Sequence, residues 1–127
     1  MRHVLSILGA SVLLLAAAVH AASAELGMDI MQTIEDSNKS LASNIALRDA
    51  RATLQDAKEL DELFAQVEAH FTQRGDAANA VELSTKSRQL TQQIVKAVNA
   101  RDFDTASGAA TDLSRTCRTC HTFYKKE

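Results

Sequence analysis

Proline, which interrupts helices because it lacks a backbone N–H donor, does not occur anywhere in the 127 residues. From residue 25 onward the chain is rich in Ala, Leu, Gln, Lys and Glu, all of which favour helix. Apolar residues recur there at steps of three and four, the spacing that places them on one face of a helix. The sequence therefore predicts an all-α fold.

Four segments carry this spacing, and we expect helices at about 26–43, 46–73, 77–100 and from 102 onward. The second segment has the most regular apolar stripe, with Ala50, Leu54, Ala57, Leu60, Phe64, Val67 and Phe71. Gly75 is expected to end this helix, and Asp76 to cap the next one. The break near Ser43 and Asn44 has no comparable capping residue.

Polar residues interrupt two of the stripes, at Ser37 and Asn38 in the first segment and at Ser87 in the third. The connections near residues 44, 75 and 101 are short, which makes consecutive helices antiparallel neighbours. We therefore expect an antiparallel, up-down-up-down four-helix bundle that forms a single domain.

The N-terminus has the pattern of a secretory signal peptide. Arg2 and His3 precede an apolar run over 4–19, which closes on the small residues 22–24. A transmembrane anchor is the alternative, but the run is short for a bilayer span. We expect cleavage after Ala24, so that residues 1–24 are removed and residues 25–127 form an exported, periplasmic domain without a membrane span.

The charge of this domain argues against a nucleic-acid partner. Residues 1–24 contain one arginine and no acidic residue, which leaves 13 Lys and Arg against 16 Asp and Glu, a formal charge of −3. Proteins that bind nucleic acid usually present a basic surface. Only two cysteines are present, so no framework of several disulfides can stabilise the domain.

Those two cysteines belong to the C-x-x-C-H pattern of c-type haem attachment, Cys117-Arg-Thr-Cys120-His121. Two thiols one helical turn apart can bond to the two vinyl groups of one haem, and the adjacent imidazole can bind the iron. A thioredoxin-like dithiol, a disulfide or a zinc site with His70 are the alternatives. A thioredoxin-like dithiol would lie in a βαβ context that this sequence lacks, and a zinc site would have few ligands to draw on.

In the expected bundle, the start of the first helix and the end of the last helix lie at the same end. Met31 is six residues from Glu25, and His121 is six residues from the C-terminal Glu127, so the two are level. A thioether opposite an imidazole is a standard axial pair for haem iron. Met31 is therefore our candidate for the sixth ligand. A core-filling role for Met31, and ligation by Met28 or His70, remain alternatives.

The chain resembles cytochrome c-prime and its relative, the soluble periplasmic cytochrome b family. The c-prime likeness lies in Cys117 to His121, followed by Tyr124 and Lys125, and the b-type likeness in the segment 31–34 and in the spacing from Asn99 to His121. The resemblance covers essentially all of residues 25–127. It implies one covalent haem c with Met31 and His121 as axial ligands. Typical c-prime proteins lack such a methionine and bind small gases at the open position.

No catalytic set stands out in the sequence, and we do not expect an enzyme. The leading hypothesis is a one-electron carrier that serves redox partner proteins, as a monomer or homodimer. A c-prime-like gas-binding protein with five-coordinate iron is the first alternative. A haem subunit of a larger redox complex is the second.

Overall fold

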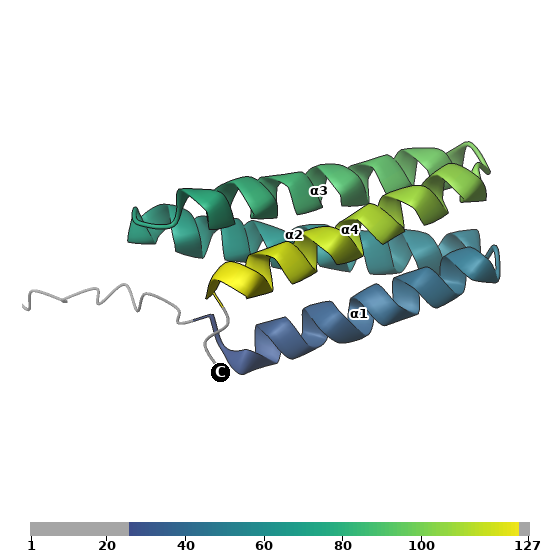
Figure 1. Cartoon of the computed structure of the whole chain (residues 1–127). Coiled ribbons are helices and arrows are strands. Elements are labelled where there is room, and N and C mark those ends of the chain that lie inside the picture. The colour runs from purple at the N-terminus through teal and green to yellow at the C-terminus, as the bar shows by residue number, and fades with distance from the viewer. Residues whose placement is uncertain (1–25, 125–127) are drawn as a thin grey trace, which may run out of the picture.

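The computed structural model describes residues 26–124, and these residues form four α-helices and no strand (Figure 1). The helices are α1 (Met28–Ala46), α2 (Ala50–Arg74), α3 (Ala78–Asn99) and α4 (Phe103–Tyr124). The all-α prediction is thereby confirmed.

The four helices pack around a common core. α1 and α3 each lie against both α2 and α4. Each helix turns an apolar face inward, and the largest side chains without solvent exposure include Leu41, Leu60, Ile94 and Leu113, one from each helix. Burial of such faces is the main favourable contribution to the folding free energy. The four stripes predicted from the sequence therefore meet in one core.

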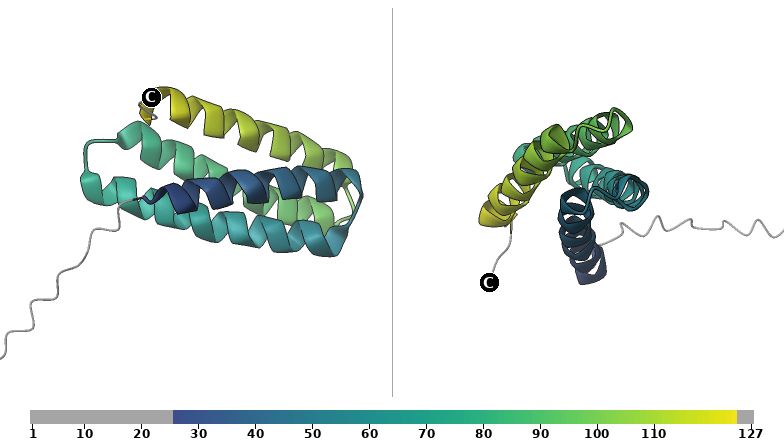
Figure 2. Two further views of the ribbon diagram at one scale, coloured as in Figure 1. Left: turned by 90° about the horizontal axis from the view of Figure 1, so that it is seen from below. Right: turned by 90° about the vertical axis from the view of Figure 1, so that its right-hand side faces the viewer.

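Three-residue links join the helices. The links at 47–49 and 100–102 lie at one end of the molecule, and the link at 75–77 lies at the other (Figures 1 and 2). Gly75 ends α2 as predicted. Its φ of 73° lies in the left-handed region that glycine adopts without strain, and its N–H donates to the Phe71 carbonyl oxygen.

The first helix boundary differs from the prediction. α1 continues through Asn44 to Ala46, and Asn44 Nδ2 donates to Asp56 on α2 over 2.7 Å. The link lies at 47–49 instead, because Asp49 caps α2 by accepting a hydrogen bond from the Ala52 N–H over 3.0 Å. An aspartate before an apolar stripe is a known capping pattern, and it marks this boundary better than the polar residues at 43–44.

The predicted cap of the third helix is also wrong. Ala77 occupies the N-cap position of α3, and no side chain caps it. The Asp76 carboxylate instead pairs with the Arg74 guanidinium, with 3.1 Å between Nε and Oδ1. This hydrogen-bonded pairing lowers the pKa of Asp76. Arg74 therefore competes successfully with the helix N-terminus for the carboxylate.

The predicted signal peptide at 1–24 lies outside the described residues. So does Lys125, which belongs to the likeness to cytochrome c-prime. Within residues 26–124, none of the helices combines the length and apolar character that a membrane span requires.

Candidate functional site

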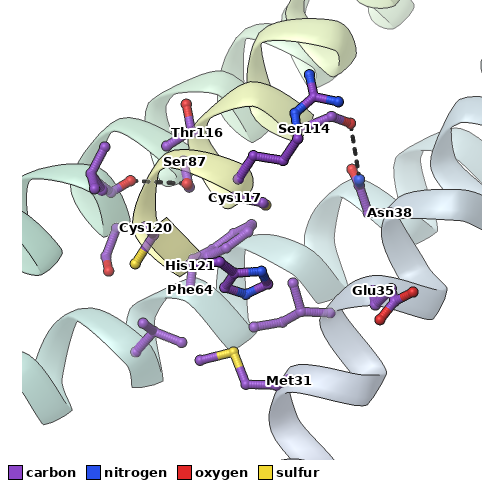
Figure 3. A pocket seen from close by; sticks show the side chains of 15 residues that line it. Met31, Glu35, Asn38, Phe64, Ser87, Ser114, Thr116, Cys117, Cys120 and His121 are labelled. Carbon is purple, nitrogen blue, oxygen red and sulfur yellow. Dashed lines mark hydrogen bonds between the residues drawn. The ribbon is translucent and has the colours of Figure 1, made fainter. Parts of the chain in front are cut away.

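A pocket of about 360 Å³ opens between the helices (Figure 3). This volume lies within the range of small-molecule sites in proteins. All four helices contribute to its walls. The lining residues are Met31, Ile34, Glu35, Asn38, Phe64, Val67, Leu83, Ser84, Ser87, Ser114, Thr116, Cys117, Arg118, Cys120 and His121.

α4 presents the C-x-x-C-H segment to this pocket. Cys117, Cys120 and His121 stand at positions i, i+3 and i+4 of one helix, so they share a face, and all three line the pocket. Both thiols are half-buried and neither is in a disulfide, whereas His121 is largely exposed. The pocket therefore reaches the protein surface on the side of the last turns of α4.

Burial raises the pKa of both thiols. Burial, helped by the neighbouring Cys120, raises the pKa of Cys117 to about 11, and burial also raises the pKa of Cys120. A redox-active dithiol needs the opposite, a thiol whose pKa is lowered so that the thiolate can attack. The surroundings of this pair thus disfavour the thioredoxin-like alternative.

α1 supplies Met31 to the same pocket. Figure 3 shows the Met31 thioether and the His121 imidazole extending from α1 and α4 into the space between these helices. Met28 is 87% exposed and does not line the pocket. His70 also lies outside the lining, where its ring packs edge-on against Phe71 at 5.1 Å between centroids. The structure brings Met31, and neither rival ligand, to the cysteines.

A hydrogen bond from Asn38 Nδ2 on α1 to Ser114 Oγ on α4, 3.1 Å long, records how these helices are aligned. Asn38 follows Met31 by seven residues, and Ser114 precedes His121 by seven. Seven residues are about two turns, or roughly 10.5 Å of helix. Because the links at 47–49 and 100–102 lie at one end of the molecule, the start of α1 and the end of α4 lie at the other, and Met31 and His121 lie on the same side of this bond. Each is seven residues from the bond along its helix.

Small polar residues form much of the wall opposite α1, and sequence reasoning did not assign them to the site. Ser84 Oγ donates to the Ala80 carbonyl oxygen over 2.7 Å, and Ser87 Oγ donates to that of Leu83 over 2.9 Å. Both hydroxyls are satisfied within α3, so these buried residues need no other partner and leave room in the pocket. The one sign of this wall in the sequence was Ser87, which interrupts the apolar stripe of the third segment.

Tyr124 packs away from the pocket. Its ring lies 5.2 Å from that of Phe71 between centroids, and it does not line the pocket. Tyr124 therefore joins the end of α4 to the end of α2.

The lining fits a haem in two respects. Five side chains, those of Met31, Ile34, Phe64, Val67 and Leu83, offer apolar surface to a flat macrocycle. Two thiols on one face of α4 match two vinyl groups.

A bare metal ion fits less well. Within residues 26–124, no three His, Cys, Asp or Glu side chains are grouped so that they could hold a metal ion. A structural zinc site needs four protein ligands, whereas a haem carries four nitrogen ligands of its own and takes one or two from the protein. The available donors therefore suit haem better than zinc.

No protein-family model, curated protein or solved structure matches this chain.

Proposed function

We propose that the protein is a single-haem c-type cytochrome that carries one electron at a time between redox partner proteins. One observation carries this proposal: Cys117, Cys120, His121 and Met31, which come from opposite ends of the chain, line one pocket. The C-x-x-C-H pattern alone would fit other uses of two thiols. Its combination with a methionine across an apolar pocket is typical of haem ligation.

The proposed architecture is an antiparallel, up-down-up-down bundle with the haem near one end. The links between consecutive helices have three residues each and lie at alternate ends of the molecule. Both features support an antiparallel arrangement of consecutive helices. The pocket extends from the middle of the bundle toward the first turns of α1 and the last turns of α4, which supports a haem site toward that end.

Cys117 and Cys120 would hold the haem covalently. Each thiol would add across one vinyl group, with the sulfur bonding to one vinyl carbon and the thiol hydrogen moving to the other. This addition would consume no oxidant or reductant. Because the two thiols are one helical turn apart on α4, the attached group would be held against the apolar wall formed by α1 and α2.

His121 and Met31 are the proposed axial ligands. The bound haem supplies the one-electron chemistry of its iron. The His121 imidazole and the Met31 thioether would both hold the iron, which would leave no place for a substrate and favours an electron carrier over an enzyme. Ile34, Phe64 and Val67 limit the access of water to the buried side of the pocket.

We further propose that the signal peptide is cleaved after Ala24 and that the protein then acts in the periplasm as a monomer or homodimer. The N-terminal apolar run supports this location. It also suits the chemistry, because bacteria attach haem to such motifs outside the cytoplasmic membrane.

The test is expression in a cell that matures c-type cytochromes. We expect the exported protein to have the mass of residues 25–127 plus one haem and to stay coloured after extraction with acid acetone. The C117A/C120A double variant is the control and should lose its haem to the solvent. Haem that extracts freely from the wild type, or a mature protein with two intact thiols, would contradict the proposal.

A further inference from the structure

The hydrogen bond between Asn38 and Ser114 lies in the wall of the haem pocket and joins α1 directly to α4. These two helices carry the two proposed axial ligands. The apolar contacts between helices are non-directional, whereas a hydrogen bond weakens steeply when its distance or angle changes. This bond therefore restricts both the separation and the relative sliding of α1 and α4.

Its place along the helices suits that role. Asn38 is two turns from Met31 on α1, and Ser114 is two turns from His121 on α4. An α-helix is stiff over two turns, so a shift at the hydrogen bond is passed on to both ligands. Equal spacing on the two helices keeps Met31 and His121 level with one another.

Asn38 is a half-buried polar residue beside the core-facing stripe of α1. Its Oδ1 is enclosed without a hydrogen-bond partner among residues 26–124, which costs folding free energy that an apolar side chain of similar size would avoid. The stripe of α1 is apolar on either side, at Ile34 and Leu41. A residue that breaks a local packing rule in this way is typical of a functional position.

We propose that Asn38 and Ser114 are positioning residues that keep Met31 opposite His121, an inference that rests on the proposed haem function. With the bond intact, the thioether stays bound to the iron. Without it, α1 can move relative to α4, and Met31 is released more often. Asn38 and Ser114 themselves do not touch the iron in this account.

The experiment measures carbon monoxide binding to the reduced, haem-loaded protein, because the gas binds only when Met31 has left the iron. In N38A and in S114A we expect this rate to rise about fivefold, the effect of losing one hydrogen bond. The double variant should also rise about fivefold, because both substitutions remove the same bond. S114T keeps the hydroxyl and should stay within twofold of the wild type.

N44A is the matched control. Asn44 also lies on α1 and also makes a hydrogen bond to another helix, but its partner is Asp56 on α2. We expect N44A to leave the carbon monoxide rate within twofold of the wild type. A purely structural role for Asn38 would give N38A and N44A the same rate.

Unchanged rates in N38A and S114A, or an equal rise in N44A, would overturn the inference. A wild type that holds haem covalently without a Met31 ligand would overturn this inference alone. A wild type without covalent haem would overturn the proposed function as well, so the two failures are distinguishable by mass and colour.

Discussion

Leu113 offers a direct test of the packing around the pocket between the helices. Its side chain has no solvent exposure, and it lies one turn before Cys117 on the same stripe of α4. Leu113→Ala removes three carbon atoms from this site, and neighbouring side chains can fill the space only in part. Buried leucines replaced by alanine cost about 2.7–5 kcal/mol, and a fully enclosed site with partners on both sides belongs near the middle of that range. We therefore expect a loss of about 3–4 kcal/mol.

That loss is large for a domain of this size, whose total stability is about 5–15 kcal/mol. Each 1 kcal/mol lowers Tm by about 4–8 °C in a domain of about 100 residues, so the loss of about 3–4 kcal/mol should lower Tm by about 12–32 °C. Urea unfolding followed by circular dichroism measures the difference, with wild type and variant at the same haem content. Leu47→Ala is the control, because Leu47 is 74% exposed in a link and should change stability by less than about 0.5 kcal/mol. A loss below 1 kcal/mol for Leu113→Ala would refute the described core.

Three further predictions concern the axial ligand, a helix cap and pH. Met31→Ala should open the distal position, turn the iron largely high-spin and lower the reduction potential, because a thioether favours ferrous iron, whereas His70→Ala should leave the absorption spectrum unchanged. The reverse result would assign the sixth ligand to His70. Asp49→Ala should cost about 1 kcal/mol by removing the cap of α2, measured by urea unfolding, and no change would mean that water replaces the cap. Hydrogen bonds from Thr105 lower the pKa of Asp102, so the stabilisation by Asp102 should be present above the ordinary carboxyl pKa and disappear as the pH falls through the lowered value. Stability curves of wild type and Asp102→Ala should therefore converge in acid, and a constant difference would contradict the assignment.

The sequence predicted the helices well because their evidence is local. Apolar steps of three and four identified Leu60, Phe64 and Val67 as core residues, and all three are buried. Gly75 was recognised as a helix end because a left-handed residue is needed there. The break at 43–44 and the cap at Asp76 were wrong because several polar residues compete near each boundary. Tertiary partners, Asp56 for Asn44 and an ion pair for Asp76, decided the outcome.

The candidate site was predictable only in part. Spacing alone placed Cys117, Cys120 and His121 on one face of a helix, and counting from the two chain ends placed Met31 near them. The contributions of Ser84 and Asn38 could not be foreseen, because they depend on how α3 and α1 turn toward α4. A polar residue that interrupts an apolar stripe marks a position that differs from the rest of that stripe. It does not indicate whether that residue faces a pocket or the solvent.

The absorption spectra of the oxidised and reduced exported protein test the central claim most directly. A covalent haem with His121 and Met31 as ligands predicts narrow low-spin bands in the reduced protein, and slow binding of carbon monoxide that is limited by release of the thioether. A preparation with no haem absorption would contradict the cytochrome assignment. A high-spin spectrum with rapid carbon monoxide binding would show that Met31 is a core residue and that the protein binds gases.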